Sequence, residues 1–159
     1  YTDVMYASFG IEFYSKVLIM EAAGGLFGSL ISSRLGSRVK ENARLMILFL
    51  GAMGAALALE PLAALTGSAA VCLVPFLLSG TALTVFNIQF MSYVQLRADE
   101  AYLGRVFSII FTVAVLFMPV GSFVFSFLLD TTSPASFAVV GGGIILLAAA
   151  GLAAFRKKE

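Results

Sequence analysis

The amino-acid sequence predicts an all-α integral membrane protein built from five membrane-spanning helices. Of its 159 residues, 60% are hydrophobic and only 12% are charged, whereas soluble globular domains carry about 25% charged residues. The apolar residues are gathered into long runs separated by polar breaks. Because lipid offers no hydrogen-bond partner to open strand edges, we expect these runs to be helices.

Each run is compared with the length needed to cross the hydrocarbon core, which is about 20 helical residues. We expect helices at about residues 14–31, 45–60, 68–94, 105–129 and 135–155. The second run is short, and its end is placed at Glu60 and Pro61, because proline has no N–H to continue a helix. The chain opens on Tyr1 and the number of crossings is odd, so residues 1–159 are expected to form one partial domain of a longer protein.

The distribution of basic residues predicts the orientation of these helices. Basic residues in short loops remain on the cytoplasmic side. Nine of the ten Lys and Arg residues fall in the first break, the third break and the C-terminal tail, and Lys16 is the exception. We therefore expect a multi-pass protein of the cell membrane (a bacterial inner or a plasma membrane) with a cytoplasmic C-terminus.

Several classes of function are disfavoured by composition. The chain has no histidine and a single cysteine, Cys72, so neither a disulfide framework nor a Cys/His metal cluster is expected. It also lacks the phosphate-cradling pattern G-x-x-x-x-G-K-[ST]. A net charge of +1 gives no reason to expect a nucleic-acid partner. We expect no enzyme activity, catalytic residue, cofactor or metal.

Two helices carry polar stripes, since polar side chains of membrane helices turn away from lipid. On the fourth helix the stripe spans an arc of about 80°, and on the third helix a similar arc becomes more polar toward the cytoplasmic end. Each stripe either packs against a neighbouring helix or lines a cavity. The candidate cavity residues are Thr84, Asn87 and Gln95 on the third helix and Ser108, Thr112, Pro119 and Ser122 on the fourth.

Glu21 is a carboxyl group within the first apolar run, about seven residues from its external end. It is a candidate for binding and releasing a proton during transport. The alternative is that it reaches outward to water or pairs with a basic residue elsewhere. In the same helix, Gly24 and Gly28 form a small-xxx-small pair, which is expected to let another helix backbone come close.

The first basic break resembles the loop motif of the major facilitator superfamily through Gly28, Arg34, Gly36 and Arg38. Three later segments, 87–95, 103–108 and 119–121, are similar to the C-terminal half of the macrolide-efflux and siderophore-exporter branch of that superfamily. The resemblance implies helices eight to twelve of a twelve-helix transporter. It would place the first, third and fourth helices around a central cavity and the other two outside.

The sequence therefore suggests a secondary active transporter, with proton-coupled export of amphipathic small molecules of the drug or siderophore type as the expected activity. Its partners would be the bilayer, the substrate, protons and the missing N-terminal half of the same protein. A membrane-embedded subunit of a larger complex, either an ATP-driven pump or a structural scaffold, is the alternative.

Overall fold

The computed structural model describes residues 11–35, 43–128 and 135–156, and every secondary-structure element in these ranges is a helix. The elements are α2 (Ile11–Leu35), α4 (Ala43–Ala58), α5 (Glu60–Leu65), α6 (Ala69–Arg97), the 3-10 helix η1 (Glu100–Tyr102), α7 (Leu103–Leu128) and α8 (Ala135–Arg156). The predicted all-α class is confirmed. Five helical segments are long and apolar enough to cross a membrane.

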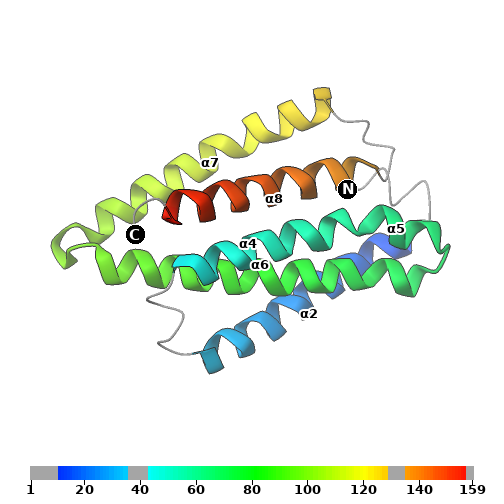
Figure 1. Cartoon of the computed structure of the whole chain (residues 1–159), viewed down its shortest axis with the longest axis horizontal. Helices are drawn as coiled ribbons and strands as arrows, with labels where there is room; N and C mark the ends of the chain where they lie inside the picture. The colour runs from blue at the N-terminus through cyan, green and yellow to red at the C-terminus, as the bar shows by residue number, and fades with distance from the viewer. Residues whose placement is uncertain (1–10, 36–42, 129–134, 157–159) are drawn as a thin grey trace.

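Successive long helices run in opposite directions, so the chain crosses the bundle from end to end (Figure 1). This alternation brings the described arginines of the helix termini together at one end, which we call the basic end. The other end, which we call the far end, contains the start of α2, the α5–α6 turn and the start of α8. The basic end is defined by Arg34, Arg44, Arg97 and Arg105, and the far end by Glu12, Leu65 and Ala135.

The second apolar run does not end at Glu60 and Pro61. Helical hydrogen bonding continues across the junction of α4 and α5, where the Leu59 N–H donates to the Ala55 carbonyl at 3.1 Å and the Ala63 N–H donates to the Leu59 carbonyl at 3.0 Å. Proline is tolerated here because it occupies the first turn of α5, where no intrahelical N–H is needed. The apolar segment consequently extends from Arg44 to Leu65 over 22 residues.

Helices α2 and α6 pack with almost no space between their backbones, and glycine makes this approach possible. A Cβ atom on Gly80 would lie 2.5 Å from the Glu21 carbonyl oxygen. A Cβ on Gly28 would lie 2.6 Å from the Thr81 carbonyl oxygen, and one on Gly24 would collide with the Leu77 carbonyl. The structure thus places Gly24 and Gly28 directly against α6.

A second close contact joins α4 to α8. A Cβ atom on Gly54 would lie 2.7 Å from the Gly141 carbonyl oxygen, and one on Gly141 would lie 2.6 Å from the Ala58 nitrogen. The core is concentrated toward the far end, where the rings of Phe76 and Phe137 meet edge to face at 6.0 Å. The buried core cluster comprises Phe13, Val17, Leu57, Ala63, Cys72, Phe76 and Phe137.

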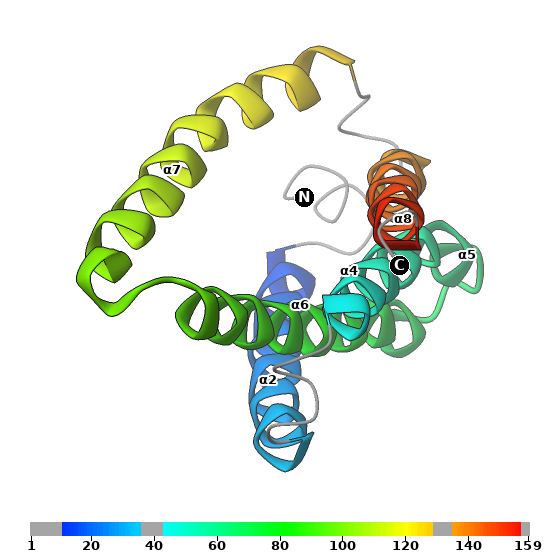
Figure 2. The same cartoon turned by 60° about the vertical axis from the view of Figure 1, so that its left-hand side comes forward.

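Helix α7 is the exception to this packing. It departs from α6 through η1 and lies apart from α2, α4 and α8 in the view of Figure 2. Among its residues whose exposure is described, 103–127, none is buried. Its four polar stripe residues that were expected to face the interior, Ser108, Thr112, Pro119 and Ser122, are all exposed. The sequence pattern alone could not determine whether another helix covers this stripe.

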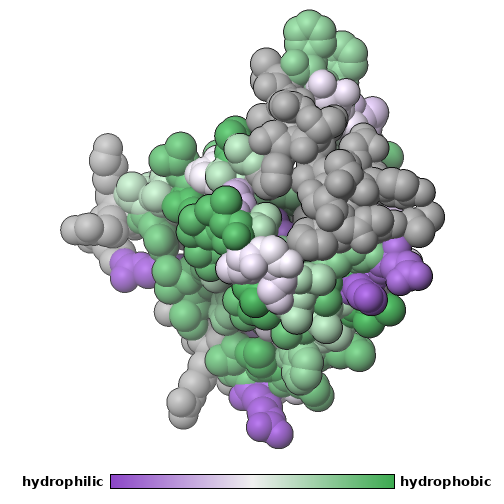
Figure 3. Space-filling model, turned by 90° about the vertical axis from the view of Figure 1, so that its right-hand side faces the viewer, coloured by the Kyte–Doolittle hydropathy of each residue, from purple (hydrophilic) through white to green (hydrophobic). Residues whose placement is uncertain are grey.

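Much of the surface that the described residues form is apolar. Figure 3 shows hydrophobic side chains over most of the coloured part of the far-end face, with hydrophilic residues in a few separate places. Leu26, Leu65, Phe123 and Leu146 are each at least 70% exposed. Contiguous apolar surface of this extent is unusual for a water-soluble monomer, and a lipid environment or another protein surface would cover it.

The α2–α6 contact gives a matched pair of glycine substitutions. Gly24→Ala is expected to lower the free energy of unfolding by about 1–3 kcal/mol, because the new methyl group meets the α6 backbone, which cannot move out of its way. Gly25→Ala is the control, because its methyl group would meet only the Thr84 hydroxyl, at 3.4 Å. Unfolding in a detergent titration measures both, and equal destabilisation by the two changes would contradict this packing.

Candidate functional site

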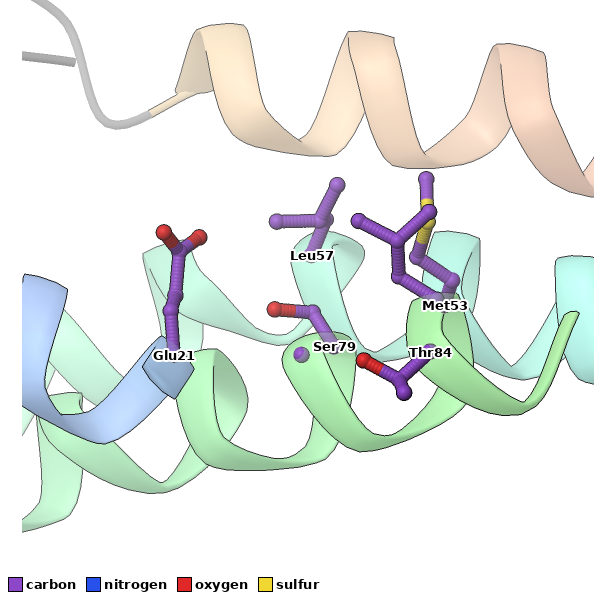
Figure 4. Close-up of a pocket in the computed structure, with 7 residues that line it drawn as sticks. Glu21, Met53, Leu57, Ser79 and Thr84 are labelled. Atoms are coloured by element: carbon purple, nitrogen blue, oxygen red, sulfur yellow. The ribbon is translucent and has the colours of Figure 1, made fainter. Parts of the chain in front are cut away.

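A small pocket lies where α2, α4 and α6 meet, and Figure 4 shows the side chains that line it. Its position follows from the glycine contact described above, because the close approach of α2 to α6 places Glu21 beside Gly80. Helix α4 closes another side with two apolar side chains. The lining residues are Glu21, Met53, Leu57, Ser79, Gly80, Leu83 and Thr84.

Glu21 is the only ionisable residue in this lining. Its side chain is partly buried and stands at one end of the pocket, with the carboxyl group pointing to the same side as Leu57 (Figure 4). A carboxyl group in apolar surroundings is costly to keep charged without a partner. The arrangement is suited to holding a proton and releasing it when water or a cation reaches the site.

Two hydroxyl groups give the pocket its remaining polarity. Ser79 donates to the Phe76 carbonyl of its own helix at 3.0 Å, which leaves its oxygen able to accept a hydrogen bond. Thr84 lies one turn further along α6 and contacts the glycine-bearing face of α2. These oxygens, together with Glu21, provide partners for ordered water in a wall that is otherwise apolar.

The size of the pocket limits what it can hold. Its volume is about 190 Å³, whereas pockets for drug-sized ligands occupy about 300–1,000 Å³ and one water molecule occupies about 30 Å³ in the liquid. The pocket is therefore large enough for a few water molecules and too small for a large amphipathic substrate.

The structure brings together only part of the set of residues predicted from sequence. Glu21 and Thr84 line the same pocket. Asn87 and Gln95 are exposed on α6, and the four candidates on α7 lie on a helix that contacts neither α2 nor α4 closely. Of the loop motif, Gly28 is buried against α6 and Arg34 is exposed, while Gly36 and Arg38 lie outside the described residues.

A buried polar contact toward the basic end also joins α2 to α6. The Gln89 amide nitrogen donates to the Ser32 hydroxyl at 2.8 Å, and both residues are buried. Within the described part of the chain, the Gln89 carbonyl oxygen has no hydrogen-bond partner. The contact fixes the register of the two helices about two turns away from the pocket.

Sequence reasoning missed the most deeply buried carboxyl group described. Glu60 was placed at an external helix end, but it is only 1% exposed. Length gave a partial signal, since the second run is too short to cross a bilayer unless it continues past Pro61. Length alone does not show that other helices pack around Glu60. Among the described residues, no group of three or more His, Cys, Asp or Glu side chains is arranged to hold a metal ion.

Comparison with known proteins gives no assignment: no family model, no curated protein and no solved structure matches the chain.

The Ser32–Gln89 contact predicts a measurable coupling energy. Ser32→Ala and Gln89→Leu should each destabilise the protein, and the double variant should lose less than their sum, because the two side chains share one hydrogen bond. We expect a coupling of about 0.6–1.7 kcal/mol, which spans the mean and the maximum found by double-mutant cycles for hydrogen bonds between helices in a membrane protein. Unfolding titrations of all four proteins give the value, and strict additivity would rule out the shared bond.

Proposed function

We propose that this chain is part of a membrane-embedded, proton-coupled secondary transporter of the major facilitator type, and that Glu21 is its proton-coupling group. The observation that carries the proposal is the pocket between α2, α4 and α6, in which a partly buried carboxyl group is the only ionisable lining residue. Transporters of this class place polar sites between helices near the bilayer midplane. A carboxyl group inside a membrane helix is rarely retained without a function.

The proposed membrane orientation places the basic end in the cytoplasm. The four described arginines of that end lie together, whereas Lys16 is the single described cation toward the far end. This asymmetry agrees with the preference for positive charge in cytoplasmic loops. Glu21 then lies in the external half of the membrane, about 15 Å along the helix from Ile11.

The proposed cargo is an amphipathic small molecule, bound outside the Glu21 pocket. The pocket is too small for such a molecule, and the polar stripe of α7 is exposed and available to line a larger cavity. Ser108, Thr112 and Ser122 would supply hydroxyl groups there among aromatic and aliphatic neighbours. A cavity wall of this kind is better suited to a mostly apolar substrate than to a sugar or an inorganic ion.

A membrane-embedded subunit without a transport cycle of its own is the second candidate. The observation in its favour is that none of the most apolar window of the Glu100–Phe127 span, which contains α7, is buried. The apolar and polar faces of α7 would both be available to a partner protein. The two candidates differ in one respect that can be measured. A transporter moves substrate in proportion to the proton gradient, and a subunit of an ATP-driven pump follows ATP instead.

Proton coupling is tested by Glu21→Gln in the full-length protein. The amide keeps the shape of the carboxyl group but cannot release a proton, so export of an amphipathic dye should fall to the level of cells without the transporter. Glu12→Gln is the matched control, since Glu12 is an exposed carboxyl group in the first turn of the same helix. Dye efflux is measured with and without a collapsed proton gradient. Unchanged, gradient-dependent export by Glu21→Gln would refute the role of Glu21.

A further inference from the structure

The strongest unexplained feature of the molecule is the side chain of Glu60. It is 1% exposed, and neither of its carboxyl oxygens has a hydrogen-bond partner within the described residues. Leaving a charged carboxylate without partners in an apolar interior costs several kcal/mol or more. In this conformation the neutral, protonated form of Glu60 is therefore favoured.

The surroundings of Glu60 come from three helices at the far end of the bundle. Helix α5, which begins with Glu60, packs against α6 and α8. The carboxyl group is close enough to the Cys72 thiol of α6 to interact with it electrostatically. The adjoining core consists of apolar side chains, among them Phe76 and Phe137. None of these neighbours offers a positive charge.

Ionisable groups elsewhere on the packed elements do not compensate Glu60. Helix α4 has Arg44 at the basic end, and α6 has Arg97 there, while α8 contains no charged residue before Arg156. On α2, Glu12 and Lys16 are exposed, and Glu21 faces its own pocket. Cys72 is thus a described titratable group that interacts with Glu60, and it supplies no positive charge.

Along the helix axis, Glu60 lies between the far end and the level of the Glu21 pocket. It stands five residues before the end of α5, which corresponds to about 8 Å of helix. Leu57, one turn deeper in the same segment, lines the Glu21 pocket. On α6, Cys72 lies at the level of Glu60, and Gly80 lies at the level of Glu21. These two positions are about 12 Å apart along the helix axis. The two carboxyl groups therefore lie at successive levels along α6.

We propose that Glu60 is a second proton-binding site, which exchanges its proton with the solution at the far end when α5 moves away from α6 and α8. The proposal rests on the proposed proton-coupled function and extends it, since it places a second protonatable group between the far-end solution and the level of Glu21. We call Glu60, Cys72 and the packed segments of α5, α6 and α8 around them the Glu60 cluster. Glu60 releases its proton to water at the far end as the cluster opens, and the carboxylate takes up a proton from the same solution before the cluster closes again.

The α4–α5 junction is a suitable hinge for this movement. Pro61 carries no N–H, so the carbonyl of Leu57, four residues earlier, lacks its usual helical donor. At this junction α4 ends at Ala58 and α5 begins at Glu60, with a turn at Leu59 between them. Kinks at such positions allow one segment to move without unfolding the other. Loss of the Glu60 proton would drive the movement, because the carboxylate gains hydration only when the cluster opens.

The position of Cys72 provides a direct test. Cys72 has no exposed surface, so a water-soluble maleimide can react with it only when the Glu60 cluster opens. In a full-length background where Cys72 is the only cysteine, the wild-type labelling rate is compared with that of Glu60→Gln over a rising external pH series. We expect equal rates at low pH and several-fold slower labelling of Glu60→Gln at high pH, because the amide cannot ionise and keeps the cluster closed.

The controls separate this proposal from its alternatives. Ionisation of Glu60 by itself would disfavour the reactive thiolate, so faster wild-type labelling has to come from opening. Glu60→Asp, which can still ionise, should retain the pH dependence, and Glu60→Leu should behave like Glu60→Gln and replaces it if the amide variant does not fold. Equal rates for wild type and both neutral variants at every pH would overturn the proposal. Labelling needs no substrate flux, so its outcome is independent of whether export proves to be proton-driven.

Discussion

The close approach of α2 and α6 is the constraint on which the rest of the site depends. Between helices in lipid there is little hydrophobic driving force, so association relies on backbone proximity and van der Waals contact. Gly24, Gly28 and Gly80 provide that proximity, because a methyl group at any of them would meet backbone atoms of the other helix. Glu21 is brought to the pocket by this contact, and within the described part of the chain no hydrogen bond or ion pair holds its carboxyl group there.

The described buried or partly buried polar groups are distributed along α6 in an informative order. Glu60 lies near Cys72, Glu21 lies beside Gly80, and Gln89 bonds to Ser32 nearer the basic end. The first two are ionisable and are surrounded mainly by apolar groups, while the third is a neutral amide with a defined partner. This order agrees with the proposed function, in which the two carboxyl groups bind and release protons in the outer half of the membrane. The contact between Gln89 and Ser32 keeps α2 and α6 in register.

Helix α7 is the long helix whose polar and apolar surfaces the other described helices leave uncovered. Its polar stripe is well defined in sequence, but in the structure the stripe is exposed and makes no contact with the Glu21 pocket. A large apolar helix of this kind gains little stability until another surface covers it. Substrate binding and proton binding are therefore separated in the proposed function, with the small α2–α4–α6 pocket serving protons and a larger cavity beside α7 serving the substrate.

Hydrophobic run length and composition determined by themselves that the chain is helical and where its five long apolar segments lie, because apolar segments of this length have few other ways to satisfy their backbone groups. The small-residue spacing of Gly24 and Gly28 also indicated a close helix contact, although not that α6 would be the partner. The position of Glu60 could not be predicted in the same way. A glutamate followed by proline is typical both of a helix end and of the first turn of a continuing helix, and the two cases differ only in what packs around it. The tertiary structure decided between them, because α6 and α8 enclose the side chain of Glu60 and leave the polar stripe of α7 uncovered.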